Sequence, residues 1–317
     1  MFTMLARLWC VLAWVAGAGL STGAWAQNLV ILGPRVQEQA NGVLALMSYS
    51  VVPDLTSSNL SIRSGGADKT GIFMTQLGGG FTVSKSVPLY LEGAAAYSRY
   101  DPVFIASDGA ETRRLPTKWN TVSGTGGIGW DFRITPELAL RPIFNFSLGT
   151  VASDLRVAQA YLNHVTDRQL EFINGGRLDV YGLGGSLMLD WEHYRENYEV
   201  DVELRYTDIR LQTYGVDNPS LQGKASARTA NIWARYRAPT GIMALDRPLR
   251  YVLELSHSRY LGSQADILGF DRLTTVGLGL ELDTSAHQVF VTRIRGVLRY
   301  VFGNNVSGVS LGLAASF

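Results

Sequence analysis

Cysteine is nearly absent from this sequence. The 317 residues include one cysteine, Cys10, which lies in an apolar run at the N-terminus. A cleavage sequence follows that run, so the chain after cleavage is expected to contain no cysteine. A disulfide framework and a cysteine-ligated metal site are therefore both excluded for the mature chain.

Long apolar runs are also absent, apart from the one near the N-terminus. Residues 1–7 carry a single positive charge, residues 8–20 are apolar, and Ala24-Trp25-Ala26 is a small-x-small cleavage sequence. This pattern predicts a signal peptide over residues 1–26 and a mature chain that begins at Gln27. A transmembrane helix is the alternative, but the apolar run is shorter than the roughly 20 residues that such a helix needs.

The charges show no excess of one sign. The chain has 28 Lys and Arg residues against 27 Asp and Glu residues, and removal of residues 1–26 takes away one basic residue, which leaves 27 of each sign. This balance gives no reason to expect a nucleic acid as a partner. The remaining length of about 290 residues is compatible with two soluble domains or with one large β domain.

Alternation of apolar and polar residues is present throughout the mature chain. For example, Tyr198, Val200 and Val202 alternate with Glu199 and Asp201. Segments of about ten residues with this period are typical of a transmembrane barrel, in which one face of each strand contacts lipid and the other faces the lumen. The fold class expected is all-β, a transmembrane antiparallel up-and-down β-barrel of about 12 strands. The strands are expected at residues 57–64, 70–83, 87–100, 119–133, 138–151, 178–191, 198–206, 227–237, 249–258, 274–283, 289–302 and 306–317.

The connections between these segments differ in length. If the last strand ends in the periplasm, the inner turns are residues 84–86, 134–137, 192–197, 238–247 and 284–288. The outer loops are then residues 101–118, 152–177, 211–226 and 258–270, which are longer on average, as is usual for such barrels. Aromatic residues are expected in two belts near the strand ends, where amphipathic rings favour the level of the lipid headgroups.

The last residues resemble the terminal strand of bacterial outer-membrane barrels. Val309, Leu311 and Leu313 alternate with smaller residues, and the chain ends on the aromatic residue Phe317. In such barrels the terminal Phe is read by the machinery that inserts barrels into the membrane, so this resemblance implies that Phe317 is the barrel-insertion signal.

The segment before the first strand, residues 27–56, has a different pattern. Within residues 34–47, Val36, Ala40, Val43 and Leu44 fall near helical spacing after a proline suited to a helix start. A short helix inside the barrel lumen is one interpretation. A periplasmic extension, or an additional strand over residues 43–52, is the other.

One stretch resembles a known family. Val52-Pro53-Asp54-Leu55-Thr56-Ser57-Ser58-Asn59-Leu60-Ser61-Ile62 leads into about twelve strands and a terminal Phe, which together look like the solitary outer-membrane autotransporter-type β-barrel domain family. The similarity covers about residues 36–317. It implies a twelve-stranded translocator barrel without a secreted passenger, and it supplies no catalytic residues.

Two motifs suggest chemistry but fit the barrel better. Residues 124–129 match the dinucleotide-binding pattern G-x-G-x-x-G but lie inside a strand, whereas that pattern needs a strand before it and a helix after it. His257 and Ser258 are adjacent on one expected strand, so their side chains point to opposite faces and do not form a catalytic pair. No spacing supports a metal site, and no cofactor is expected.

Charged residues on the lumen-facing side are the best functional candidates. Opposite charges either pair across strands and fill the lumen, or form an ion-selective constriction, because rings of charge set selectivity in pores. The candidates are Glu199, Asp201, Glu203, Arg205, Arg250, Glu254, Glu281, Arg293, Arg295 and Arg299.

Three functions are compatible with the sequence. The first is a non-enzymatic, integral outer-membrane barrel of autotransporter translocator type in a Gram-negative bacterium, with a plugged or gated lumen. The second is a small porin-like channel for ions or solutes, and the third is a barrel-borne surface hydrolase. The expected partners are outer-membrane lipid and, during insertion, the barrel-assembly machinery.

Overall fold

The structure is a computed structural model of the chain. It describes residues 41, 44–45, 47–52, 59–63, 71–101, 103–107, 112–116, 119–153, 177–215, 222–263, 265, 270–283, 293–304 and 306–316. The chain divides into two compact units, residues 1–32 and residues 33–317, and the described residues all belong to the second. The predicted signal peptide (residues 1–26) and the predicted insertion signal Phe317 lie outside the described residues. Within the described part, no helix is both long enough and apolar enough to cross a membrane.

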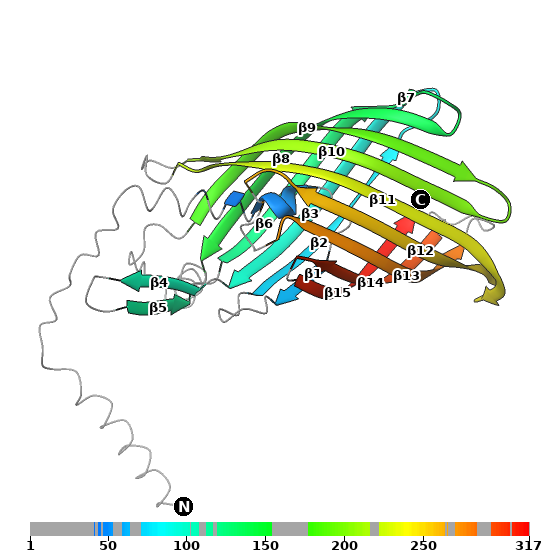
Figure 1. Cartoon of the computed structure of the whole chain (residues 1–317). Helices are drawn as coiled ribbons and strands as arrows, with labels where there is room; N and C mark the ends of the chain where they lie inside the picture. The colour runs from blue at the N-terminus through cyan, green and yellow to red at the C-terminus, as the bar shows by residue number, and fades with distance from the viewer. Residues whose placement is uncertain are drawn as a thin grey trace, which may run out of the picture. The chain divides into compact units, whose positions relative to one another are not determined.

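Antiparallel strands make up almost all of the described residues of the second unit (Figure 1). Its main strands are β1 (Asn59–Arg63), β2 (Gly71–Thr82), β3 (Leu89–Asp101), β6 (Trp119–Trp130), β7 (Phe132–Arg133), β8 (Leu138–Ser153), β9 (Arg177–Tyr194), β10 (Glu199–Tyr214), β11 (Lys224–Ala244), β12 (Arg247–Tyr260), β13 (Arg272–Asp283), β14 (Arg293–Gly303) and β15 (Val306–Ser316). Each pairs with the next along the chain, and β7 continues the line of β6 on β8. The first and last strands, β1 and β15, lie side by side, which closes the sheet into an up-and-down barrel. The predicted barrel of about twelve strands is confirmed.

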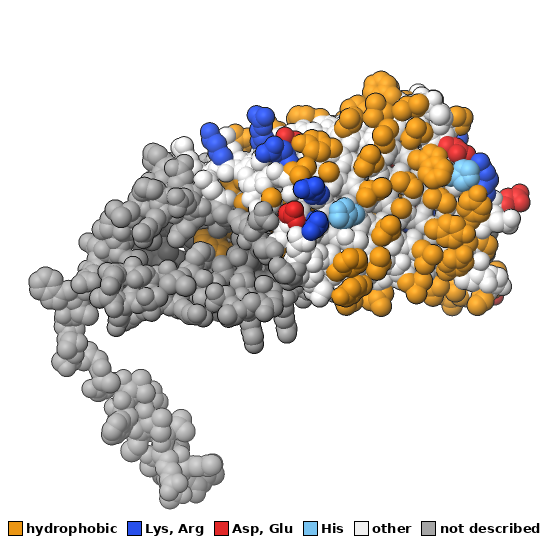
Figure 2. Space-filling view, in the orientation of Figure 1, with side chains coloured by type: hydrophobic (Ala, Val, Ile, Leu, Met, Phe, Trp, Pro, Cys, Tyr) orange, Lys and Arg blue, Asp and Glu red, His pale blue; other side chains and the backbone are white. Residues whose placement is uncertain are grey.

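The barrel exterior is apolar over most of its height. Large hydrophobic side chains point outward and are about half exposed, among them Leu77, Val122, Ile128, Phe144, Leu148, Leu183, Leu187, Leu204, Ile232, Leu253, Leu255, Leu278, Ile294, Leu298, Val309 and Leu311. Figure 2 shows hydrophobic side chains in bands across the face of the barrel that it displays. An apolar surface of this extent is incompatible with water and matches the lipid-facing band of a transmembrane barrel.

An aromatic ladder runs along the outside of the barrel where the short turns lie. Trp191 stacks on His193 with ring centroids 5.4 Å apart, and Tyr198 follows at 5.8 Å from His193. Tyr236 and Tyr251 continue the series at 6.0 and 5.9 Å. These rings from β9 to β12 form one of the two belts expected at the headgroup level.

The polarity of the two faces inverts near the long-loop end of β9, β10 and β11. Up to Tyr206, β10 is apolar outside and polar inside, but beyond it Ile209 and Leu211 are fully buried in the lumen while Arg210 is exposed outside. The same inversion marks the long-loop ends of β9 and β11. We call residues 177–180, 207–213 and 224–228 the inverted rim. Its lumen face is apolar, so something other than water must contact it.

Three connections differ from the sequence-based expectation. Strand β10 continues to Tyr214, beyond the end predicted at residue 206. At residue 206 only the polarity of the two faces inverts, and the strand itself goes on. The predicted loop at residues 101–118 contains a separate hairpin of β4 (Val103–Ser107) and β5 (Thr112–Pro116). The predicted inner turn at residues 238–247 is wrong, because β11 and β12 continue through it to a two-residue turn, with a register shift between Pro239 and Met243.

Candidate functional site

A helix from the N-terminal segment lies inside the barrel at the long-loop end. Residues 41, 44–45 and 47–51 are helical, so the alternative of an additional strand over residues 43–52 is wrong. Leu44, Met47 and Val51 are fully buried. They pack in one cluster with Val151 on β8 and with the lumen face of the inverted rim, namely Leu178, Val180, Ile209, Leu211, Ala225 and Ala227. The helix therefore supplies the apolar partner that the inverted rim requires.

Close packing at two points fixes the depth of this helix. Gly149 on β8 has no side chain, and a Cβ there would lie 2.3 Å from the Met47 Cε atom. On the opposite side, Tyr49 packs edge-on against Tyr260, with centroids 4.7 Å apart, and lies 5.6 Å from the Phe270 ring. Gly149 thus allows the close approach of the helix, whereas a Cβ at Gly126 or Gly127 would meet Phe146 or Glu92 instead.

Polar groups of the barrel wall cap the C-terminal end of the helix. Thr125 Oγ1 donates to the Val51 carbonyl at 2.8 Å, and Gln76 Nε2 donates to the Val52 carbonyl at 3.0 Å. Ser50 Oγ lies 3.0 Å from Ser123 Oγ. The last carbonyls of a helix have no partner within it, and in an apolar interior each needs one from elsewhere. The barrel wall supplies these partners, so this part of the wall is specific for the C-terminal end of a helix.

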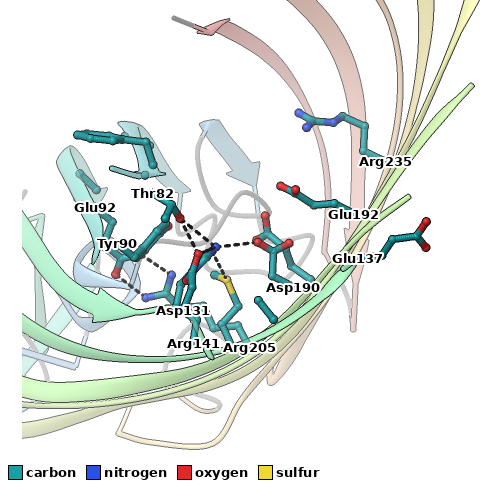
Figure 3. Close-up of a pocket in the computed structure, with 18 of the residues that line it drawn as sticks. Thr82, Tyr90, Glu92, Asp131, Glu137, Arg141, Asp190, Glu192, Arg205 and Arg235 are labelled. Carbon is teal, nitrogen blue, oxygen red and sulfur yellow. Dashed lines mark hydrogen bonds and ion pairs between the residues drawn. The ribbon is translucent and has the colours of Figure 1, made fainter. Parts of the chain in front are cut away.

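Below the helix, a cavity of about 480 Å³ opens towards the short turns (Figure 3). Gln76, which binds the helix end, lines it at one extreme, and Pro136 and Glu137 line it at the mouth. Its wall carries six carboxylates and five guanidinium groups: Glu92, Asp131, Glu137, Asp190, Glu192 and Glu203, with Arg133, Arg141, Arg205, Arg235 and Arg299. The cavity is therefore nearly balanced in charge.

A bidentate ion pair crosses the lumen within this cavity. Arg205 on β10 donates from both Nη atoms to the Glu92 carboxylate on β3, at 2.8 and 2.7 Å. Asn145 Nδ2 donates to the same carboxylate at 2.6 Å, and Ser186 Oγ accepts from Arg205 at 2.9 Å. Gly127 makes room for it, because a Cβ there would lie 2.5 Å from the Glu92 Cγ atom. Two-point pairs of this kind are strong and fix geometry, so they hold β3 and β10 together across three intervening strands.

A second network is centred on Arg141, nearer the short turns (Figure 3). Its guanidinium pairs with Asp131 and, at 2.9 Å, with Asp190. The ring of Tyr90 lies against it, 3.9 Å from the ring centroid to the Arg141 Cζ atom. Thr82 Oγ1 donates to Asp131 at 2.7 Å. Strands β2, β3, β8 and β9 are thereby linked inside the barrel.

A third network joins the short-turn ends of β10 to β14. Glu199 pairs with Arg237 at 2.7 Å, with Arg250 at 2.8 Å and with Arg293 at 2.8 Å. Asp201 pairs with Arg235 at 2.8 Å. The remaining pairs are Asp201 with Arg237, Glu281 with Arg237, Arg293 and Arg295, Asp283 with Arg250 and Arg293, and, further along the lumen, Glu254 with Arg299.

The structure thus brings nine of the ten candidate lumen charges into ion pairs. Glu203 is the exception: it lines the cavity wall but forms no hydrogen bond or ion pair with the described residues. The arrangement corresponds to charges paired across strands. A ring of one sign, which an ion-selective constriction needs, is not found among the described lumen residues.

Several residues of these networks were not among the candidates from the sequence. Glu92, Arg141 and Asp190 lie on the lumen face of predicted strands, at the same alternation as their polar neighbours. In each predicted strand, every second residue faces the lumen. Applying this rule to all charged residues of the strand identifies these three. Their partners across the lumen are not predictable in this way, because β3 and β10 are distant in sequence.

The rim around the short turns carries a smaller cluster. Glu137 lies 2.8 Å from His193 Nδ1 and 3.0 Å from Arg195 Nη2. The hydrogen bond with His193 and the pairing with Arg195 lower the pKa of the Glu137 carboxyl below its ordinary value. Glu137 therefore stays ionised at neutral pH and joins two neighbouring turns.

His257 and Ser258 do not form a catalytic pair in the structure. His257 points outward, with Nδ1 2.9 Å from Thr274 Oγ1, whereas Ser258 is fully buried and accepts from Asn231 at 2.6 Å. The two side chains thus lie on opposite faces of β12. No group of three or more His, Cys, Asp or Glu side chains within the described part is placed to hold a metal ion.

Comparison with known proteins finds likeness in structure only. No family model matches this sequence. No curated protein matches it either. Similar solved structures include the β domain of the Bordetella autotransporter BrkA, at 13% identity over 81% of this chain and 95% of that one, with a TM-score of 0.43. The translocator domain of the autotransporter NalP from Neisseria meningitidis shares 10% identity over 81% and 85%, with a TM-score of 0.41. The NanC porin shares 8% identity over 81% and 98%, with a TM-score of 0.37.

Proposed function

We propose that this protein is a non-enzymatic barrel of the outer membrane of a Gram-negative bacterium, of autotransporter translocator type, whose lumen is held closed by the N-terminal helix. The observation that carries the proposal is the inverted rim. Lumen faces of transmembrane barrels are polar where water fills them. An apolar lumen face that packs on Leu44, Met47 and Val51 is suited to a resident helix and unsuited to a water-filled channel.

The direction of the helix supports the proposal that the N-terminal segment closes the lumen. At its N-terminal side, Asn41 Oδ1 accepts from the Lys224 backbone amide at the start of β11, which lies at the long-loop end. At its C-terminal side, Val51 and Val52 contact Thr125 and Gln76, deeper in the barrel. The chain therefore enters the lumen at the long-loop end, which is the cell exterior in barrels of this kind. A segment held in this direction is suited to closing the lumen from the long-loop end.

Conductance across planar bilayers tests the proposal. The full chain should give no stepwise current, because the helix packs on the apolar lumen face and closes the lumen at the long-loop end. Deletion of residues 41–52 should produce current steps, and Leu44→Asp with Met47→Asp should do so in part, since a buried charge without a partner expels the helix. Ser48→Ala is the matched control, because it changes another fully buried residue of the same helix without adding a charge, and it should stay silent.

The alternatives make different predictions in the same experiment. A porin-like channel conducts as the full chain, with Arg295→Glu shifting its selectivity towards cations. A barrel that stays silent after the deletion is a scaffold closed by its charges, which argues against both a plug and a pore. Hydrolysis of lipid or peptide substrates by the purified barrel would support the surface enzyme instead.

A further inference from the structure

The outer faces of β12 and β13 form a regular ladder of paired side chains. From the short-turn end to the long-loop end, the register gives four apolar pairs, then a polar pair, then a pair of arginines: Leu249 with Leu282, Tyr251 with Leu280, Leu253 with Leu278, Leu255 with Val276, His257 with Thr274, and Arg259 with Arg272. The first four belong to the lipid-facing band. The arginine pair is the first lipid-side charge beyond it.

The arginine pair is unfavourable in the protein alone. Like charges directly opposite each other on neighbouring strands repel, and both side chains are exposed on the outside. Arg272 donates to Asn304 Oδ1 at 2.9 Å and lies 3.9 Å from Asp271, a distant and solvent-exposed contact. Arg259 has no hydrogen bond or ion pair to a described residue. The two guanidinium groups therefore have hydrogen-bond donors that the described protein groups do not use and that an anion can accept.

Further basic side chains surround the pair on the long-loop side. Arg210, Lys224 and Arg228 are exposed on the outer face of the neighbouring strands β10 and β11, where the described carboxylate closest in register is Asp208, opposite Arg228. Figure 2 shows basic side chains gathered at the border of the apolar exterior, with a histidine at their edge. A positive patch bordering a lipid-facing band lies at the depth of the headgroups.

We propose that Arg259 and Arg272 bind the phosphate of a lipid headgroup in the leaflet on the long-loop side. Two guanidinium groups side by side match the oxygens of one phosphate, which Arg recognises with paired hydrogen bonds. The phosphate removes the repulsion between the arginines and lies where the headgroup of a lipid packed on Leu255 and Val276 must be. The chemistry is shared by a phosphodiester phospholipid and by a phosphorylated glycolipid.

Binding of lipids to the purified full chain in neutral detergent distinguishes these sources. Three fluorescent probes are titrated: phosphatidylcholine, phosphatidylglycerol and lipid A. The wild type should bind at least one of the two anionic lipids more tightly than phosphatidylcholine. Arg259→Gln with Arg272→Gln should weaken that binding about tenfold or more, since the loss of one charge-assisted hydrogen bond already corresponds to roughly a tenfold change.

Arg177→Gln is the matched control, because Arg177 is exposed at the same end of the barrel but already pairs with Asp179 at 2.9 Å. It should bind as the wild type does. The heat-induced mobility shift checks the fold, and the double variant should be no less stable than wild type without lipid, because the repulsion is removed. Equal weakening for both anionic lipids assigns the site to phosphate in headgroups of net negative charge, weakening for lipid A alone assigns it to the glycolipid, and weakening for phosphatidylglycerol alone assigns it to the phospholipid. Unchanged binding by the double variant, or no preference of the wild type for an anionic lipid, would overturn the proposal.

Discussion

At the scale of single residues, the two faces of β10 have opposite requirements. Val202 and Leu204 face lipid, and Leu204 is about half exposed, whereas Asp201 and Arg205 are buried in the lumen. A charge placed on the lipid face near the membrane midplane must leave water without gaining a partner. On the lumen face, a charge can be replaced by an uncharged group of the same shape wherever no partner depends on it.

Val202→Arg should therefore lower the free energy of unfolding in lipid vesicles by about 2–4 kcal/mol. Glu203→Gln, one residue away on the lumen face, should change it by no more than about 0.5 kcal/mol. Glu203 forms no ion pair with the described residues, so its neutralisation leaves no arginine unpaired. Urea titration followed by tryptophan fluorescence measures both variants. Equal losses for the two would show that the faces of β10 are assigned incorrectly.

At the scale of elements, the turn between β11 and β12 is held in a strained conformation. Leu245 and Asp246 have φ angles of 52° and 59°, in the left-handed region that favours glycine and asparagine. A two-residue turn with both residues there is of type I′, for which Asn-Gly is the preferred sequence. Leu245 is also 84% exposed, so its side chain contributes little to packing.

Leu245→Asn with Asp246→Gly should consequently stabilise the barrel by about 1 kcal/mol. Gly241→Ala, in the same hairpin at a φ of 76°, should destabilise it, because alanine does not adopt that conformation without strain. The midpoint of the heat-induced mobility shift reports both changes. A stability that falls in the Asn-Gly variant would contradict the type I′ assignment.

Alternation predicts elements of this barrel well wherever one face contacts lipid. The register of β12 on β13 places each predicted outward residue outside, from Leu249 to Leu255. The alternation does not mark the end of β10. Beyond Tyr206 it continues with the apolar residues inside the barrel, so a strand defined by apolar residues on the outside ends at Tyr206. The β4–β5 hairpin forms a two-stranded sheet of its own, separate from the barrel sheet.

Alternation along each strand also predicted part of the candidate site. Parity within a strand shows which charges face the lumen, and it identified residues such as Glu199 and Arg293. It does not show which charges meet, because pairs such as Glu92 with Arg205 depend on the curvature that brings distant strands together. The placement of the helix, which the sequence left open, follows from the inverted rim once the continuation of β9 to β11 is known.

At the scale of the whole molecule, the proposed orientation places the long loops outside the cell. Single cysteines suit this test in a Cys10→Ser background, since Cys10 is the one cysteine of the chain. Ser107→Cys in β4 and Lys224→Cys at the start of β11 should react with an impermeant maleimide on intact cells. Pro136→Cys and Ser86→Cys, in two short turns, should react only after the outer membrane is permeabilised. The reverse pattern would invert the topology.

The central claim is that the N-terminal helix resides in the lumen, and one cross-link tests it most directly. Ser50 Oγ on the helix and Ser123 Oγ on β6 lie 3.0 Å apart, so sulfur atoms at these positions meet within bonding reach after small adjustments. In the Cys10→Ser background, Ser50→Cys with Ser123→Cys should form a disulfide in the folded barrel, detected by mass spectrometry of the linked peptides without reduction. Ser86→Cys with Ser123→Cys is the control and should form no disulfide, because Ser86 lies in a short turn and Ser123 lies beside the helix. A folded Ser50→Cys, Ser123→Cys barrel whose two thiols both stay free would contradict the account.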